Sequence, residues 1–489
     1  MLAFDNTYFR LPDRFYARVA PTTVRAPQLV RLNRLLAEAL GADAERLASS
    51  EGALVFAGNV LPEGAEPIAL AYAGHQFGVF VPQLGDGRAI LLGEVVGTDG
   101  RRRDIQLKGA GRTPFSRGGD GRAALGPVLR EYIVSEAMAA LGVPTTRALA
   151  AVTTGERVVR DRVLPGAVLT RVAASHIRVG TFQYFAARDD RQALELLAAY
   201  ALERHYPEAA RAPNKALALV DHVAAAQARL VAQWLGVGFI HGVMNTDNSS
   251  ISGETIDYGP CAFLDEYDPR KRFSSIDHQG RYAFANQPRI AQWNLARLAE
   301  ALLPLIADDE TSAVKAAEER ISRFPALFEA EYARVLRAKL GLGRELEGDR
   351  VLADDLLQRL ASNEVDHTVF FRHLCACAAD PAADAAAARL FAEPAAFHTW
   401  AEAWRRRLTD DPGTPEDRAT AMRRVNPAFI PRNHRVEQAI AAAVGHGDLG
   451  PFEALVEVLA RPYDDQPEHA DLAEPPQAEE RVMATFCGT

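Results

Sequence analysis

The stretch HGVMNTDNSSISGETIDYGP, residues 241–260, is the most informative part of this sequence. It follows residues 220–239, whose apolar side chains recur at helical spacing. It contains two short oxygen-bearing side chains, Asn248 and Asp257, among turn-forming residues. Oxygen ligands of this kind suit Mg²⁺ or Mn²⁺, which bridge phosphate oxygens. The stretch therefore predicts a metal-binding loop that serves a phosphate-bearing substrate.

The same stretch has the order of two loops of protein kinases, in which H-R-D-L-x-x-x-N precedes D-F-G. When His241 and Asn248 are aligned with the first pattern, its catalytic Asp falls on Val243. Residues 257–259, DYG, then stand at D-F-G. The metal ligands are present and the usual base is absent. Asp247 is the available proton acceptor, and a loop-capping Asp is the alternative reading of it.

The composition excludes several classes of protein. The net charge is −9, the pI is about 5.8 and no basic block stands out, so nucleic acid is not an expected partner. Four cysteines do not make a secreted disulfide framework, which predicts a reducing compartment. No apolar run approaches the roughly 18 residues that cross a bilayer, and the N-terminus lacks a signal-peptide core. We therefore expect a cytoplasmic protein with no membrane segment.

The character of the sequence changes along the chain and predicts an α+β fold. Strand-like runs dominate the first part, and helical spacing dominates from about residue 190 onward. We expect an N-terminal extension, a β-rich nucleotide-binding lobe, a helical lobe with the catalytic and metal-binding loops, and a helical C-terminal region with a flexible tail. The expected bounds of these units are residues 1–75, 76–185, 186–345 and 346–489.

Turn and helix-end residues predict the elements near the site. A helix over residues 27–41 ends at a glycine, and another helix spans residues 123–141. The turns LGDGR (84–88) and GTDG (97–100) separate three strand-like runs. Turn residues between such runs predict two successive hairpins.

Glycine-rich segments predict a polyphosphate site. In LGDGR, Gly85 and Gly87 allow backbone N–H groups to approach phosphate, and Arg88 adds a cation. A purely structural hairpin turn is the alternative. The segment GAGRTPFSRGGDGR (109–122) adds five glycines and three arginines. Forked arginine donors and backbone amides together suit a polyphosphate.

Charged residues elsewhere complete the predicted site. Lys108 ends the third strand-like run, as does the kinase lysine that holds phosphates and pairs with a helical glutamate. Glu131 and Glu136 are the candidate partners. They lie about 140° apart around a helix, so both cannot face Lys108, and the residues alone favour neither. Arg171 and Arg178 are spaced by two helical turns, so a helix would place both on one face.

The order of these motifs resembles the selenoprotein O family, also called the YdiU or UPF0061 family. The resemblance rests on the opening stretch and on YAGHQFGVFVPQLGDGRA, DIQLKGAGRTPFSRGGDGRA, REYIVSEAMAALGVPTTRALA, FSSIDHQGRYAFANQP and NPAFIPRNHRVEQAI. The N-terminal FDNTYFRLP also fits. The resemblance implies a protein-kinase-like bilobal fold, in a pseudokinase that binds ATP in a flipped orientation. It implies transfer of AMP to Ser, Thr or Tyr hydroxyls of protein substrates, with release of pyrophosphate.

The same resemblance implies roles for individual residues. It selects Glu131 as the partner of Lys108 and Asp247 as the proton acceptor, which gives three catalytic residues. It assigns Asn248 and Asp257 to a Mg²⁺ or Mn²⁺ ion. The positions that match nucleotide contacts are Gly85, Gly87, Arg88, Lys108, Asp120, Gly121, Arg171, Arg178 and Asp257. Whether UTP replaces ATP stays open.

A cation surplus agrees with a flipped nucleotide. Transfer of AMP needs the α-phosphate at the point of attack, so the β- and γ-phosphates must lie deep, where a kinase holds adenine. Five arginines exceed what an adenine slot could use; they are Arg112, Arg117, Arg122, Arg171 and Arg178. A conventional kinase is one alternative, against which Val243 argues. A non-catalytic, redox-linked ATP-binding scaffold is the other, and a scaffold has no need of both metal ligands.

One cysteine lies close to the end of the chain. Cys487, in TFCGT, stands near where eukaryotic members of the family carry selenocysteine, so this is a cysteine-containing member. Some members are thought to be redox-controlled through such a cysteine and one in the activation segment. Cys261 directly follows DYGP and is one candidate partner, and the pairing stays open.

Overall fold

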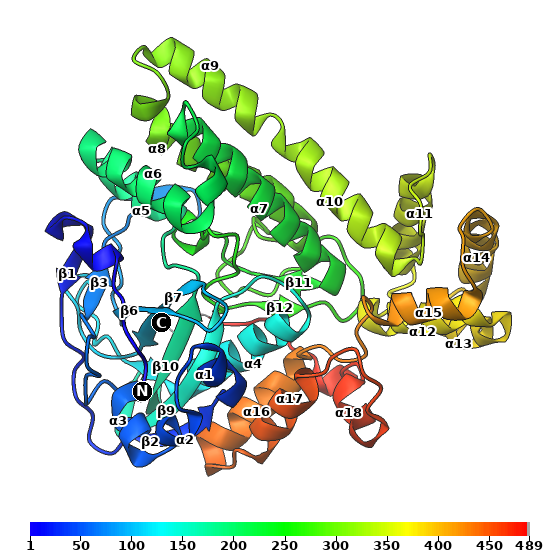
Figure 1. Ribbon diagram of the computed structural model, residues 1–489. Helices are drawn as coiled ribbons and strands as arrows, with labels where there is room; N and C mark the ends of the chain where they lie inside the picture. Colours follow the sequence, from blue (N-terminus) through cyan, green and yellow to red (C-terminus); the bar gives the residue numbers. More distant parts are fainter. Residues whose placement is uncertain (487–489) are drawn as a thin grey trace.

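The computed structural model describes residues 1–486 as an α+β protein built on a large antiparallel sheet (Figure 1). The strand order is β1-β3-β6-β7-β10-β9-β2, and the short β8 lies beside β10. The bounds are β1 Tyr16–Arg18, β2 Gln28–Leu32, β3 Ile68–Leu70, β6 Ala89–Val96, β7 Arg102–Lys108, β8 Ala123–Ala124, β9 Arg147–Val159 and β10 Val163–Ala173. Two small pairs stand apart, β4 Gly74–Gln76 with β5 Val79–Val81 and β11 Phe239–Ile240 with β12 Ala262–Phe263.

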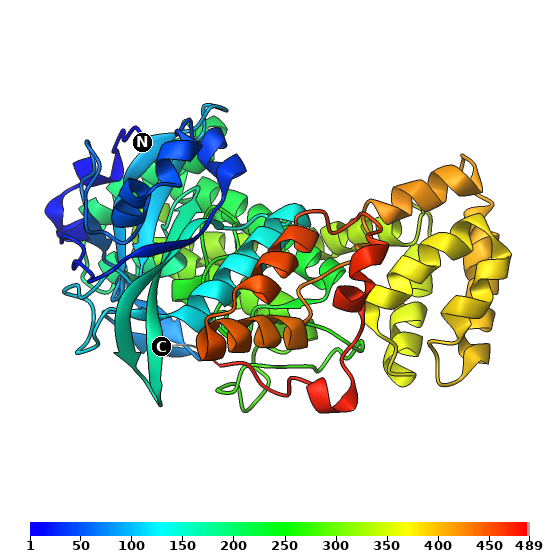
Figure 2. The same ribbon diagram turned by 90° about the horizontal axis from the view of Figure 1, so that it is seen from below.

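Helices cover both faces of this sheet, which buries strands that are apolar on both sides. The short helices α1 Arg34–Ala39, α2 Ala44–Leu47 and α3 Ser50–Phe56 share a core with one face. Helix α4, Leu125–Ala140, lies on the other face, and α16 Asn433–His446 and α17 Gly450–Leu459 pack outside it (Figure 2). The sheet and α4 therefore form one continuous unit, and the predicted helix over residues 123–141 is confirmed.

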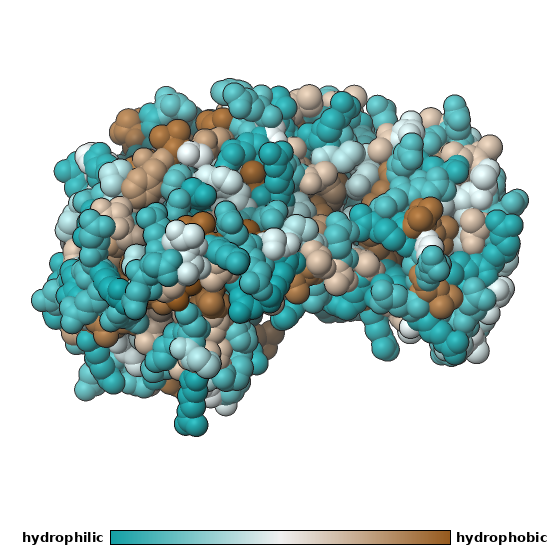
Figure 3. All heavy atoms as spheres, turned by 90° about the horizontal axis from the view of Figure 1, so that it is seen from above, coloured by the Kyte–Doolittle hydropathy of each residue, from teal (hydrophilic) through white to brown (hydrophobic). Residues whose placement is uncertain are grey.

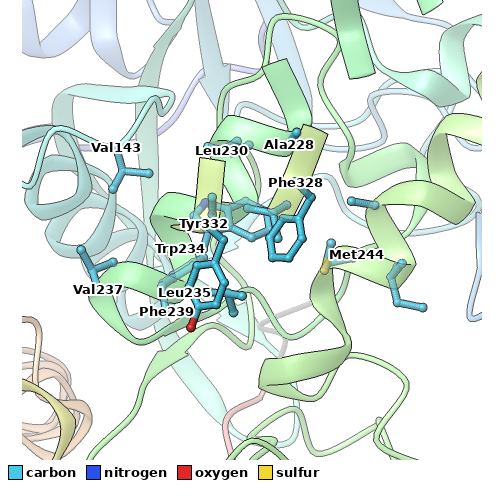
Figure 4. Packing of buried hydrophobic residues seen from close by; sticks show 14 of the residues in the cluster. Val143, Ala228, Leu230, Trp234, Leu235, Val237, Phe239, Met244, Phe328 and Tyr332 are labelled. Atoms are coloured by element: carbon cyan, nitrogen blue, oxygen red, sulfur yellow. The ribbon is translucent and has the colours of Figure 1, made fainter. Parts of the chain in front are cut away.

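A second half of the molecule is helical. Its elements are α5 Val179–Ala186, α6 Arg191–His205, α7 Lys215–Val237, α8 Gln287–Ile306, α9 Glu310–Ile321 and α10 Phe324–Lys339. Helix α7 is central, and its side chains Trp234 and Leu235 lie close to Phe328 and Tyr332 of α10 in the core (Figure 4). Gly238, with a φ of 76°, ends α7 in the left-handed conformation that glycine favours, directly before residues 241–260.

The C-terminal part adds a helical group at one end of the molecule (Figures 1 and 2). It comprises α11 Asp349–Ser362, α12 His367–Ala379, α13 Asp384–Ala388, α14 Pro394–Leu408 and α15 Pro415–Arg423. The chain then returns to α4 through α16 and α17 and passes α18, Ala470–Ala473.

The final described residues run back to the site loops. Thr485 donates its backbone N–H to Phe273 O at 2.7 Å and its hydroxyl to Pro260 O at 2.6 Å. Thr485 is therefore tied to residues 260 and 273, and the flexibility of the rest of the tail stays a prediction. Cys487 lies outside the described residues.

Two local predictions are also wrong. Residues 28–32 form strand β2, which pairs with β9, and a helix starts only after Asn33, whose side chain caps α1. Of the two predicted hairpins, β6 and β7 form the second, whereas β5 pairs with β4 and not with β6. The residue pattern of LGDGR fits a hairpin turn, but partner choice depends on segments distant in the sequence.

The surface is mostly hydrophilic, with apolar side chains in small scattered groups on the face that Figure 3 shows. Among the described residues, none of the helices combines the length and the apolar character that crossing a bilayer requires.

Candidate active site

A cavity of about 800 Å³ lies between the large sheet and the loops of residues 241–260. Eleven of the twelve residues assigned to the site from the sequence line this cavity; they are Gly85, Gly87, Arg88, Lys108, Asp120, Gly121, Arg171, Arg178, Asp247, Asn248 and Asp257. The twelfth, Glu131, reaches the site through its contact with Lys108. Arg112, Arg117, Arg122 and Val243 line the cavity as well. Segments far apart in the sequence, from Gly85 to Asp257, therefore converge on one cavity.

Lys108 makes two ion pairs at the inner wall of this cavity. Its Nζ lies 2.6 Å from Glu131 Oε2 on α4 and 3.0 Å from Asp257 Oδ1. Glu136 faces away and binds Arg147 at 2.7 Å and the Ala148 N–H at 2.8 Å. The choice that the residues alone left open is thus settled by the side of α4 that meets the sheet.

Arg171 and Arg178 also converge on Asp257. Arg171 Nη1 lies 2.6 Å from Asp257 Oδ1, and Arg178 Nη1 lies 2.7 Å from Oδ2. The prediction that a helix presents both arginines is wrong, because Arg171 belongs to β10 and Arg178 precedes α5 as its N-cap residue. The chain turns between them, and both guanidinium groups are buried, at 2% and 3% exposure.

Asp257 is the centre of this charge cluster. Burial opposes its ionisation, but Lys108, Arg171 and Arg178 together hold its pKa well below the usual range. Its φ of 63° lies in the left-handed region, which is rare for a residue with a side chain and marks a constrained position. Glu131 and Asp86 also pair with these cations, Glu131 with Arg171 at 3.3 Å and Asp86 with Arg178 at 3.7 Å, so the cluster by itself is balanced. The excess of positive charge lies in the whole cavity lining, where eight Lys and Arg side chains accompany four Asp side chains, and it favours a polyanionic ligand.

The two glycine-rich segments form one wall. Thr113 donates its hydroxyl to Asp86 O at 2.6 Å, and Ser116 donates to Gly87 O, so residues 109–122 lie on the 84–88 turn. A Cβ on Gly85, which has a φ of 76°, would overlap the Phe115 ring. The sequence treated these segments as two separate candidates, whereas they are one structure with backbone amides and arginines close together.

Asp120 has its charge already paired. Its carboxylate accepts hydrogen bonds from Arg160 Nη1 and Nη2 at 2.9 and 3.0 Å. Arg160 therefore belongs to this wall, and no motif pointed to it because it lies in the turn between β9 and β10. Gly121, with a φ of 68°, follows Asp120 and lies so close to Gly111 that a side chain there would overlap its carbonyl.

Asp247 occupies a tight position beside the charge cluster. It is 8% exposed, and its Oδ1 has no hydrogen-bond partner among the described residues. Arg178 donates to its backbone oxygen at 2.6 Å, and a Cβ on Gly74 would lie 2.6 Å from Oδ1. Burial raises the pKa of Asp247 to about 6, although Arg178 opposes the rise. A carboxylate that lines a cavity and whose pKa is raised by burial is suited to accept a proton or a metal ion.

The loops that carry Asn248 and Asp257 are tied together. His241 donates from Nε2 to Ile256 O at 2.8 Å, which joins the two loops of the opening motif. Asn248 donates from Nδ2 to Val243 O at 3.0 Å, which leaves its side-chain oxygen available. The carboxamide of Asn248 and the carboxylates of Asp247 and Asp257 are hard oxygen donors, so the donor set fits Mg²⁺ or Mn²⁺.

Three supporting residues escaped the sequence analysis. Gln106 accepts a hydrogen bond from Arg171 Nε at 3.1 Å and donates to Asp86 Oδ2 at 3.1 Å. The Tyr72 ring lies 4.5 Å from the Arg178 guanidinium carbon. The signal for Gln106 was its place two residues before Lys108 on a strand, which puts both on one face. Tyr72 is the first residue of the motif YAGHQFGVFVPQLGDGRA, but nothing in that motif singled it out.

The described cysteines are unreactive in their surroundings. Cys261, Cys375 and Cys377 are free and buried. Burial raises the pKa of Cys261 to about 12, so its thiol stays protonated near neutral pH.

Glycine-rich walls and buried cations around one acidic centre define a site for a nucleoside polyphosphate. Comparison with known proteins is consistent with this class. A family described as Protein adenylyltransferase SelO matches residues 1–460. A Methylorubrum populi protein named Protein nucleotidyltransferase YdiU is 65% identical over 100% of this chain and 99% of its own length.

Two further relatives carry the same name. The protein from Bradyrhizobium sp. (strain BTAi1) is 63% identical over 99% of both chains. That from Nitrobacter hamburgensis is 62% identical over 100% of this chain and 96% of its own. The chain belongs to the SelO protein adenylyltransferase family, and it is an enzyme of the nucleotidyltransferase class.

Proposed function

We propose that this enzyme transfers AMP from ATP to Ser, Thr or Tyr hydroxyls of protein substrates and releases pyrophosphate. The observation that carries this proposal is the buried cluster in which three cations share Asp257, beside a loop with Val243 at the kinase base position. A kinase with this loop would lack its base, whereas a deep cationic pocket suits a leaving pyrophosphate.

The orientation of ATP follows from where the cations lie. Lys108, Arg171 and Arg178 stand at the inner wall, and two of them are almost completely buried. In the proposed complex the β- and γ-phosphates bind these cations, and the backbone of the glycine-rich wall donates hydrogen bonds to them. The adenosine then points outward, flipped relative to a kinase, and the α-phosphorus lies near Asp247. Arg88 and the arginines of residues 109–122 line the same path.

Asn248 and Asp257 are the proposed ligands of a Mg²⁺ or Mn²⁺ ion. When bound, such an ion neutralises phosphate charge as attack occurs. Because Asp257 already serves three cations, a divalent ion alone would raise the positive charge of the cluster. The ion and the phosphates are therefore expected to bind together.

Asp247 is the proposed proton acceptor. The substrate hydroxyl oxygen forms a bond to the α-phosphorus, and the bond from that phosphorus to the bridging oxygen of pyrophosphate breaks. The hydroxyl proton passes to a carboxylate oxygen of Asp247, whose Oδ1 has no competing donor among the described residues. Glu131 holds Lys108 in place for the leaving group.

The proposed architecture is bilobal and kinase-like. In support, Lys108 on β7, Glu131 on α4 and the loops after α7 follow the order of the kinase elements. The proposed units remain residues 1–75, 76–185, 186–345 and 346–489. The first of them supplies β1, β2 and β3 to the large sheet, so it is an integral part of the β-rich lobe. Free buried cysteines suit the reducing cytoplasm that we propose as its location.

Label transfer tests the function directly. The purified enzyme is incubated with a protein extract, Mg²⁺ or Mn²⁺, and ATP labelled on either the α- or the γ-phosphate. We expect the α-label on protein, with an AMP adduct on hydroxyl side chains by mass spectrometry. Transfer of the γ-label would restore the kinase alternative, and transfer of neither label would favour the scaffold.

A further inference from the structure

A second cavity, of about 310 Å³, lies where α4, α7 and α10 end. We call it the junction cavity. Its apolar lining includes Leu141, Val143, Val237 and Val335. Val143 and Val237 appear at the edge of the core cluster in Figure 4. Its volume is at the lower end of the range for ligand pockets, so it suits a small ligand.

One wall of the junction cavity is a buried lysine. Lys339 is 3% exposed, and its ammonium makes no hydrogen bond or ion pair within residues 1–486. The ring centroid of Phe371 lies 4.1 Å from Nζ, and Cys375 and His367 are close enough to interact electrostatically with Lys339. None of these neighbours is a carboxylate, so the buried ammonium lacks the anion that such groups normally have.

A second polar group in the cavity is also unsatisfied. Gln233 lines the opposite wall from α7, and its Oε1 is buried without a hydrogen-bond partner among the described residues. Its Nε2 makes only a long contact of 3.5 Å to Gly142 O. Gln233 and Lys339 thus both line the cavity and each carries a polar group without a protein partner, which favours a ligand with polar atoms.

The charge around the junction cavity has one sign. Lys339, Arg334 and Arg424 line it, and within residues 1–486 no carboxylate does. Arg334 pairs with Glu331 at 2.8 Å, and Arg424 has no ion pair in the described part of the chain. The helix ends at this cavity favour cations. The helix ends do not cancel the effect of burial on the ammonium, because burial lowers the pKa of Lys339 to about 7.

We propose that the junction cavity binds a small amphipathic monocarboxylate. The carboxylate pairs with the Lys339 ammonium, and the apolar body lies against Val143, Val237 and Val335. A single buried cation matches a single negative charge, so a doubly charged phosphate would be left undercompensated. This site is separate from the nucleotide cavity, since the two share no lining residue. The Ala140–Val143 wall directly continues α4, which carries Glu131.

Calorimetric titration with octanoate, below its micellar concentration, tests the site. The wild-type enzyme is expected to bind octanoate at one site and to bind octan-1-ol at least tenfold more weakly. Lys339→Met keeps the apolar stem and removes the charge, so octanoate affinity should fall at least tenfold. Lys315→Met, at an exposed lysine on α9, is the matched control and should bind as the wild type does.

A second variant tests the same site in case Lys339→Met does not fold. Ala338 lines the cavity but is exposed, so Ala338→Trp should block the mouth without disturbing the core, and octanoate binding should be lost. Unchanged octanoate affinity in either variant would overturn the proposal. Equal affinity of the wild type for octanoate and octan-1-ol, or no octanoate binding at all, would overturn it too.

Discussion

Two clusters of buried charge lie on the same face of β7, and they differ in whether they border the large cavity. Lys108, near the end of the strand, belongs to the cluster around Asp257 that borders the large cavity. Asp104, four residues earlier, pairs with Arg204 at 2.6 Å and with His176 Nδ1 at 3.0 Å. Arg204 also pairs with Glu94 at 2.6 Å, and none of these residues lines the cavity.

We call the cluster of Glu94, Asp104, His176 and Arg204 the closed cluster, and the one around Asp257 the open cluster. The charges of the closed cluster are paired by groups of the protein itself. Glu94 accepts further hydrogen bonds from the backbone N–H groups of Thr7 and Tyr8 at 3.0 and 2.6 Å. In the open cluster the cations also pair with Glu131 and Asp86, but they border a cavity whose lining holds eight Lys and Arg side chains and only four Asp side chains. Buried charge alone therefore does not identify a functional site. An excess of charge of one sign in the lining of a cavity does identify such a site, because a bound ligand can supply the missing counter-charge.

The largest expected effect is on the open cluster. Asp257→Asn keeps the shape of the side chain and removes the charge that gathers three cations and the metal. We expect AMP transfer to fall on the order of a thousandfold or more, because loss of metal-assisted charge neutralisation costs several kcal/mol of barrier. Transfer rates with Mg²⁺ and with Mn²⁺ check this. Near-normal turnover would remove Asp257 from the metal site, and Asp268→Asn, at a half-buried aspartate outside the cavity lining, serves as the control.

Next in size is the closed cluster. Arg204→Met removes the cation that Glu94 and Asp104 share and leaves them only Arg102 at 3.6 Å and His176 at 3.0 Å. Removing one partner of a buried ion pair costs about 3–5 kcal/mol. Chemical denaturation should show this loss, while transfer per folded molecule stays close to wild type. Arg191→Met, on the exposed part of the same helix, should change stability by less than about 0.5 kcal/mol. A large loss of transfer in folded Arg204→Met would mean that the two clusters are functionally joined.

A smaller effect is expected at Asp247. Asp247→Asn cannot take the hydroxyl proton, so transfer should drop roughly a hundredfold, within the usual contribution of a general base. ATP affinity, measured by calorimetry in the presence of metal, should change little. Lost affinity would make Asp247 a metal or nucleotide ligand instead. Retained rate together with retained affinity would reduce it to a loop cap.

The smallest effect concerns a third, single buried charge. The pKa of Lys339 falls from 10.5 to about 7 on folding because of burial. The unfolded chain therefore binds the extra proton above pH 7, and stability increases as the pH rises. From pH 7 to 8.5 the gain is roughly 1.5 kcal/mol. Denaturation curves at both pH values should show this gain for the wild type and not for Lys339→Met, and equal pH dependence would contradict the burial effect.

Local patterns in the sequence determined several features. Apolar spacing and end signals predicted α4 and α7, because a helix is specified by its own residues. The turn GTDG predicted the β6–β7 hairpin for the same reason. The motif of residues 241–260 identified Asp247, Asn248 and Asp257 as neighbours, because loop chemistry leaves a short-range signature. The order of motifs also indicated the family, which the comparisons confirm.

Only the tertiary structure decided which distant segments meet. It turned residues 28–32 into a strand beside β9, gave β5 the partner β4, and brought Arg171 and Arg178 to Asp257 from a strand and a helix cap. The residues alone could not choose between Glu131 and Glu136, since that choice depends on which side of α4 meets the sheet. Periodicity describes each element by itself. Pairing, burial and the position of a cavity depend on long-range packing, which no single segment encodes.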